Sequence, residues 1–279
     1  MEQLDIKSLY EEELKEKIFA LARESGYVLP DYGKRKSKKV GIIMSPRFSS
    51  GDEGKFYMAM YERIIYELQR ASCSSIMISP TTATLPSDMN TIQTRGLFDG
   101  LIFLGILDKG VREQIAQIDL PKVYVDIYDQ THKSDSVITE NIYSSYELTN
   151  YLIQQGHRKI AVLGGPATSY PSMMRRQGAQ QAMEDAGIRF EDKLYGLSNY
   201  DFESAYHAMN GLLARRAEFT ALFAMSDVIA FGAIRALVSA GLRVPEDVSV
   251  IGFDGITMSR YCVPVMTTIV QPSEQIALQ

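Results

Sequence analysis

The alternation of short β-rich runs with longer amphipathic stretches constrains this chain more than any other feature. The stretches between the runs carry apolar residues at helical spacing. Strands that alternate with helices build βαβ units around a parallel sheet. The first half of the chain has this pattern, with the runs VGIIMS, SIMIS, GLIFLG and KVYVD and the predicted helices 54–70 and 109–118.

A second alternating set follows the polar segment 127–135 and the strand SVIT. A chain of 279 residues exceeds what one small core usually organises, so we expect two lobes. The predicted fold class is therefore α/β, with two Rossmann-like lobes whose parallel sheets are flanked by helices. The second set comprises helices 143–155, 172–186, 201–215 and 227–240 and strands 159–165, 221–226 and 248–254.

The N-terminal segment has a different character. Residues 8–26 are predicted to form one helix, and the segment GKRKSKK, residues 33–39, then carries five basic residues in seven. The net charge of −5 argues against the whole surface lying on nucleic acid. Lys34, Arg35 and Lys36 are nevertheless candidates for contacts with a DNA backbone; a solvated linker is the alternative for so short a run.

The motifs of several functional classes are missing from the sequence. It contains no GxGxxG or GxxxxGK[ST] phosphate loop, no GxSxG nucleophile elbow and no HExxH zinc motif. We therefore expect neither an enzyme nor a bound cofactor. Cys73 and Cys262 match no metal spacing, no apolar run is long enough to span a membrane, and the acidic first residues are no signal peptide. We expect a cytoplasmic protein without a metal site.

Polar side chains follow several predicted strands directly, at the sheet edge where parallel sheets bind ligands. Carboxylates accept hydrogen bonds from two hydroxyl groups at once, so these positions suit a ligand rich in hydroxyl groups. The strand-end residues are Asp126, Ser226, Asp227 and Asp254. Each aspartate also has an alternative role: a turn for Asp254, the cap of the following helix for Asp227, and an ion pair with Lys122 or a turn for Asp126.

An arginine and three aromatic residues complete the candidate site. Arg175, on the helix that follows Pro171, would donate a fork of hydrogen bonds to ligand hydroxyl groups. Arg175 and Arg176 do not share a helix face, so one of them should face solvent. Phe48, just after the first strand, Phe202 and Tyr206 would supply an apolar face for a ring.

Long, ordered and correctly spaced stretches of the chain resemble LacI/GalR-type transcriptional regulators. They are YLIQQGHRKIAVLGGP (151–166), RRQGAQQAMEDAGI (175–188), ALFAMSDVIAFGAIRALVSAGLRVPEDVSVIGFDG (221–255) and PVMTTIVQP (264–272). The opening KSLYEEELKEKIFALARESGYVLP resembles the last helix of that family's DNA-binding headpiece. The resemblance covers nearly the whole chain.

The resemblance implies a homodimeric repressor core, similar to periplasmic sugar-binding proteins, that binds a small effector between two lobes and controls operator DNA binding. It implies a headpiece remnant at 1–38, a first lobe at 39–138 that residues 270–279 rejoin, and a second lobe at 139–269. It places effector contacts at Asp126, Arg175, Ser226 and Asp254, with Phe202 stacking on the ligand ring. Ser226 stands where the family commonly has asparagine, and the linker before Lys39 lacks the leucine of the family's hinge helices.

A sugar is therefore the expected effector, with a nucleobase or an organic acid as the alternatives, and the membrane is not an expected partner. The main alternative is a solute-binding receptor of a sugar transporter, and an α/β enzyme is a third possibility that the missing motifs oppose.

Overall fold

The computed structural model describes residues 17, 37–45, 54–81, 83–94, 96–105, 109–129, 133–216 and 218–279. Residues 1–38 and 39–279 form separate compact units, and the second unit carries the fold described below. Apart from Lys17, which is helical, the predicted helix 8–26 lies outside the described residues. Lys34, Arg35, Lys36 and Phe48 lie outside them as well.

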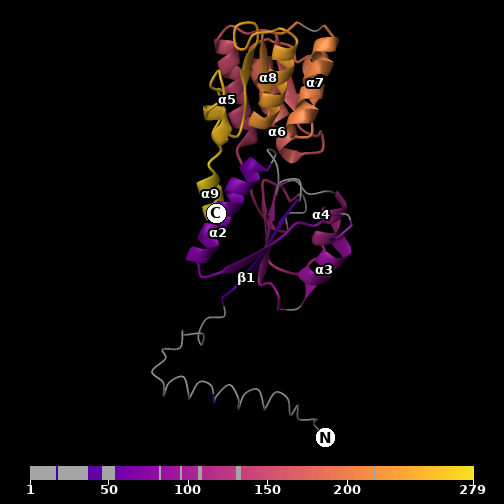
Figure 1. The fold of residues 1–279 in the computed structure, drawn as a ribbon, viewed down its shortest axis with the longest axis vertical. Coiled ribbons are helices and arrows are strands. Elements are labelled where there is room, and N and C mark those ends of the chain that lie inside the picture. The colour runs from indigo at the N-terminus through magenta and orange to yellow at the C-terminus, as the bar shows by residue number, and fades with distance from the viewer. Residues whose placement is uncertain are drawn as a thin grey trace. The chain divides into compact units, whose positions relative to one another are not determined.

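The first lobe is built on a five-stranded parallel sheet with the order β2-β1-β3-β4-β5. Helices α2, α3 and α4 connect its strands (Figure 1). The bounds of the strands are β1 Lys39–Met44, β2 Ser74–Ile78, β3 Gly100–Leu104, β4 Lys122–Val125 and β5 Asp135–Val137, and those of the helices are α2 Lys55–Arg70, α3 Leu85–Gln93 and α4 Lys109–Ile115.

Both faces of this sheet are covered, which is why its central strands read as continuous apolar runs. Successive strand residues point to opposite faces. Ile43 therefore packs in one cluster with Phe103 and residues of α3 and α4, and Ile42 packs in another with Met60 of α2.

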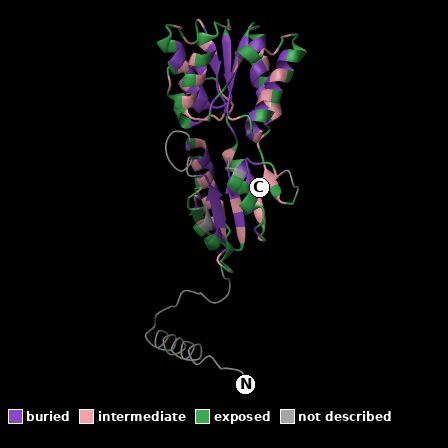
Figure 2. Cartoon of the chain, turned by 90° about the vertical axis from the view of Figure 1, so that its right-hand side faces the viewer, coloured by how far each residue is buried: buried purple, intermediate pink, exposed green. Residues whose placement is uncertain are grey.

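The second lobe is built on a four-stranded parallel sheet with the order β7-β6-β8-β9. Its strands are β6 Ile160–Gly164, β7 Tyr195–Leu197, β8 Ala221–Ala224 and β9 Ser249–Ile251, and its helices are α5 Asn141–Gln154, α6 Tyr170–Asp185, α7 Phe202–Ala214 and α8 Asp227–Ser239. Helices α5 and α6 approach closely because Gly178 has no Cβ, which would lie 2.1 Å from the Ile142 carbonyl oxygen. Figure 2 shows the buried strands between the partly exposed helices.

The chain passes between the two lobes twice. It leaves β5 through Ile138–Glu140 and enters α5. After β9 and the 3-10 helix η3 (Thr257–Arg260), isolated parallel bridges tie Ile251 to Thr267 and Asp254 to Val270. Helix α9 (Ser273–Leu278) then packs on α2 of the first lobe, where Ile276 is buried beside Met60 and Glu274 forms a 2.7 Å ion pair with Arg63.

The predicted fold class is confirmed, and the helices and strands predicted between residues 39 and 279 lie within a few residues of those in the structure. Helix α3, strand β7 and the 3-10 helices η2 (Asp192–Leu194) and η3 were not predicted. The limits of the lobes, 39–138 and 139–269, stay predictions because residues 39–279 form one compact unit. Among the described residues, no helix has both the length and the hydropathy needed to cross a membrane.

Candidate functional site

Asp126, Ser226 and Asp254 come together around one small cavity, as the strand-end argument predicts. Asp126 follows β4 of the first lobe, and the other two follow β8 and β9 of the second. The cavity has a volume of about 30 Å³, which is room for roughly two water molecules. Its lining residues are Phe56, Tyr57, Asp126, Pro171, Arg175, Tyr200, Ser226, Val228, Asp254 and Ile256.

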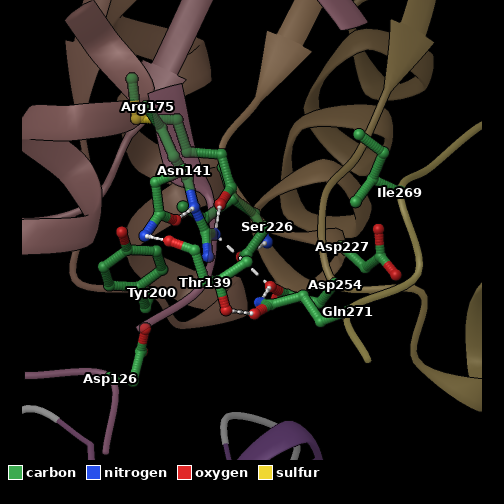
Figure 3. Close-up of polar contacts among 12 residues, drawn as sticks. Asp126, Thr139, Asn141, Arg175, Tyr200, Ser226, Asp227, Asp254, Ile269 and Gln271 are labelled. Carbon is green, nitrogen blue, oxygen red and sulfur yellow. Dashed lines mark hydrogen bonds and ion pairs between the residues drawn. The ribbon is translucent and has the colours of Figure 1, made fainter. Parts of the chain in front are cut away.

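Arg175 forms the centre of this site and is held by the second lobe alone (Figure 3). Its side chain is only 3% exposed. Nε donates to Asn141 Oδ1 at 2.8 Å, and Nη1 donates to the Met225 carbonyl oxygen and to Asp254 Oδ1 at 3.4 Å. The guanidinium group also lies 3.7 Å from the ring centre of Phe253. Nε and Nη1 of Arg175 are therefore already committed to the protein before any ligand binds.

Asp254 is fixed through both its side chain and its backbone. Oδ1 accepts from Gln271 Nε2 at 2.6 Å and from Arg175, and the backbone N–H donates to the Ile269 carbonyl oxygen at 3.0 Å. Burial raises the pKa of Asp254 to about 7; Arg175 opposes this shift and Asp227 adds to it. The backbone φ of 117° is one that a residue with a Cβ rarely adopts. Retained strain of this kind is found at functional sites.

Asp126 has fewer partners. Its Oδ2 accepts from the Tyr57 hydroxyl group at 2.6 Å, whereas its buried Oδ1 accepts from no group among the described residues. Burial raises the pKa of Asp126, against the opposing effects of Arg175 and the Tyr57 hydrogen bond. The residue is left-handed, with a φ of 59°. Its predicted alternative partner, Lys122, instead donates to the carbonyl oxygens of Ala116 and Ile118.

The prediction that Asp227 caps helix α8 is wrong. The cap is Ser226, whose Oγ accepts from the Ile229 N–H at 3.1 Å. Asp227 lies one residue further on, and its carboxylate accepts from the Ile256 N–H at 2.9 Å and from the Thr268 hydroxyl group at 2.6 Å. Asp227 therefore ties the segments after β9 to α8, and it does not line the cavity.

The chain is similar to several known proteins. The family described as "periplasmic binding protein-like domain" matches residues 149–279. The HTH-type transcriptional repressor PurR of Serratia proteamaculans is 39% identical over 143 residues, which are 51% of this chain and 42% of that protein. The ribose operon repressor of Haemophilus influenzae is 26% identical over 95% of this chain and 80% of its own length.

A solved structure extends the likeness to the fold. The transcriptional regulator CelR in complex with cellobiose superposes with a TM-score of 0.80 at 26% identity, over 94% of this chain and 80% of that one. Over nearly its whole length the chain is therefore similar to transcriptional repressors and regulators, as its resemblance to the LacI/GalR family implies. The names of its relatives, which are transcriptional repressors and regulators, agree with the expectation that it is not an enzyme. The matched region spans less than half of PurR.

Sequence reasoning missed several residues of this site. Tyr57 and Tyr200 line the cavity, and Asn141 and Gln271 hold Arg175 and Asp254. Phe202 is 39% exposed and does not line the cavity, so its stacking role stays a prediction. The position of Asn141 at the start of the helix that follows the first crossover was the one signal available for it.

The arrangement is suited to binding rather than to bond chemistry. No group of three or more His, Cys, Asp or Glu side chains in the described part of the chain could hold a metal ion. Asp126, Asp254 and the Ser226 hydroxyl group can exchange hydrogen bonds with a polar ligand. Of the two adjacent arginines, Arg175 faces the cavity and Arg176, with 41% of its side chain exposed, stacks on the Tyr195 ring.

Proposed function

We propose that this core binds a small polar effector in the cavity around Arg175, and that this binding controls the operator DNA binding of the complete repressor. A carbohydrate is the favoured ligand class. One relative is named a ribose operon repressor, and one structural neighbour is a complex with cellobiose. The proposed contacts are Asp126, Arg175, Ser226 and Asp254.

The observation that carries the proposal is the buried Oδ1 of Asp126, which has no hydrogen-bond partner in the described part of the chain. A buried polar atom that lacks a hydrogen bond costs about 1–3 kcal/mol. Because Asp126 lines the cavity, a ligand bound there can supply the missing donor. Asp126 belongs to the first lobe, while Arg175, Ser226 and Asp254 belong to the second. A ligand that donates to Asp126 and also contacts the second lobe would hold the lobes together. It would thereby shift the population of lobe arrangements.

The cavity volume of about 30 Å³ is too small for a sugar. Sites that bind small ligands usually enclose about 300 Å³ or more. Ligand entry would therefore require the lobes to part, and closure on the ligand would follow. The lobes would thus have an open and a closed arrangement. A repressor core needs two such arrangements to transmit a signal to a DNA-binding headpiece.

The test is a thermal-shift screen of the full chain against sugars and nucleobases, followed by calorimetry of each compound that raises the melting temperature. We expect at least one sugar to bind, and Asp126→Ala to weaken it by about 100-fold, which corresponds to about 3 kcal/mol. Asp247→Ala, which removes an exposed carboxylate paired with Arg243, is the control and should bind as the original does. Absence of any ligand, or equal binding by Asp126→Ala, would refute the proposal.

Operator DNA is the second proposed partner. Lys34, Arg35 and Lys36 lie outside the described residues, and their proposed contacts with DNA phosphates rest on the basic run alone. Such contacts would weaken with rising salt concentration, because each neutralised phosphate releases a counterion. A repressor that binds an operator would act in the bacterial cytoplasm.

A homodimer is the proposed assembly. The segment around η3 leaves large apolar side chains in solvent, with Tyr261 77%, Val263 96% and Val265 70% exposed. Clustered exposed apolar residues are typical of protein interfaces. Light scattering of the full chain should give twice the 31.3 kDa mass of one copy.

A further inference from the structure

Tyr200 forms one wall of the cavity in a backbone conformation that disfavours tyrosine. Its φ is 64°, in the left-handed region that costs a residue with a Cβ about 1–2 kcal/mol. Glycine and asparagine adopt this region more readily than a bulky aromatic residue does. A tyrosine that is kept at such a position, next to a binding cavity, points to a role for its side chain.

The ring of Tyr200 packs against two other segments of the second lobe. The backbone of Gly165, just after β6, contacts the ring directly. Only glycine allows this approach, because a Cβ at this position would lie 2.0 Å from Tyr200 Cε2. The hydroxyl group shares a 2.7 Å hydrogen bond with Ser172 Oγ. The following residue, Asp201, caps α7 by accepting from the Ser204 N–H at 2.6 Å. Every one of these contacts lies within the second lobe.

Tyr200 therefore stays in place when the lobes part. Ser172 and Arg175 are three residues apart on α6, so they are neighbours on one helix face. Through its hydrogen bond to Ser172, Tyr200 covers the first turn of α6, which precedes Arg175. The ring therefore bounds the site on the side of the N-terminus of α6. A ligand on Arg175 and Asp254 cannot extend past this ring.

We propose that Tyr200 limits the effector to a compact ligand with a single ring, such as a free monosaccharide, and excludes disaccharides. This inference rests on the proposed effector site. It sets the chain apart from its structural neighbour CelR, which was solved with the disaccharide cellobiose. Tyr200 is thus a specificity-determining residue.

The experiment compares the thermal stability of the full chain and its variants with ribose, glucose, cellobiose and maltose. Tyr200→Gly removes the ring at a φ that glycine accepts, and Tyr200→Asn provides a second variant that tolerates the left-handed conformation. Tyr200→Phe keeps the ring and loses only the Ser172 hydrogen bond. Arg216→Gly is the matched control, because Arg216 is also left-handed, with a φ of 51°, and does not line the cavity.

We expect neither disaccharide to stabilise the original chain, Tyr200→Phe or Arg216→Gly. We expect cellobiose or maltose to raise the melting temperature of Tyr200→Gly or Tyr200→Asn by about 5 °C or more at saturation. The inference is overturned if a disaccharide stabilises the original chain, or if neither ring-removing variant gains a disaccharide. In the first case the proposed effector site survives; if no compound in the earlier screen of sugars and nucleobases stabilises the original chain, the proposed function fails as well.

Discussion

Asp126 and Asp254 occupy equivalent places in the two lobes and yet are held very differently. Each follows a parallel strand, each has a positive φ, and burial raises the pKa of each. Asp254 accepts from Arg175 and Gln271. Among the described residues, Asp126 accepts a hydrogen bond only from Tyr57, through Oδ2, and its Oδ1 has no donor there.

The difference indicates that the two lobes have different roles in the site. The second lobe organises its half of the site through its own network, which joins α5, α6, β8 and the segment after β9. The first lobe contributes a carboxylate that still has an acceptor to offer. In the proposed function, the second lobe would therefore define the ligand geometry, and the contact with Asp126 would report that the ligand is present.

The largest expected effect comes from removing Arg175. Arg175→Ala leaves Asn141 Oδ1, the Met225 carbonyl oxygen and Asp254 without this donor in a buried site. Breaking a buried ion pair by removing one partner costs about 3–5 kcal/mol. We expect a loss of that size in the free energy of unfolding, measured by urea denaturation.

The adjacent Arg176 provides the control for this prediction. Its side chain is 41% exposed and forms a long 3.6 Å ion pair with the exposed Asp192, so Arg176→Ala should cost less than about 1 kcal/mol. Equal losses for the two variants would mean that Arg175 does not organise the second lobe's half of the site.

The fold was predictable because the dominant signal is local. Central strands covered on both faces produce continuous apolar runs such as IAVLG, and the helices between them keep their amphipathic pattern. Helix α3 was missed because it contains only a few large apolar residues, among them Met89 and Ile92, within a polar segment. Strand β7 was missed because it has only three residues, YGL.

The strand-end carboxylates were predictable for the same reason, since parallel strands bring their carboxyl ends to one edge. The partners of these residues were not, because Tyr57 and Gln271 reach the site through packing between distant segments. Local reasoning also chose the wrong residue of Ser226-Asp227 as the helix cap. Either side chain can cap, and tertiary contacts to Ile256 and Thr268 draw Asp227 away.

The pH dependence of stability should also separate the two halves of the site, with Asp254→Asn as the informative variant. The folded pKa of Asp254 is about 7, above its ordinary value of 3.8. Between about pH 4 and 7 the native state retains a proton that the unfolded state has released, so the contribution of Asp254 to stability falls as the pH rises. The free energy of unfolding of the original chain minus that of Asp254→Asn should decline across this window and be constant above it.

Asp247→Asn is the control for that measurement. Its hydrogen bonds with Arg243 lower the pKa of Asp247 to about 2, so its contribution changes only below about pH 4. The difference between the original chain and Asp247→Asn should stay flat from pH 4 to 7. A flat difference for Asp254→Asn as well would show that Asp254 is ionised throughout, as an aspartate dominated by Arg175 would be.

The smallest expected effect concerns backbone strain, and it compares glycine with alanine at each aspartate. Both substitutions remove the carboxylate, so their difference isolates the backbone. Asp254 has a φ of 117°, outside the small left-handed region near 50–70° in which Asp126 lies at 59°. We expect Asp254→Gly to be more stable than Asp254→Ala by about 1–2 kcal/mol, and the corresponding difference at Asp126 to be smaller. Urea denaturation of the four variants measures both differences.

Glu62, inside α2, is the control position, where alanine should be more stable than glycine. Glycine in a helix interior is less stable than alanine by about 1 kcal/mol, so Glu62→Gly should unfold at lower urea concentration than Glu62→Ala. If alanine is favoured at Asp254 as it is at Glu62, the strain at Asp254 is absent in solution. The Asp254 backbone would then differ in solution from the conformation in the structure, and the second lobe would hold its carboxylate no more firmly than the first.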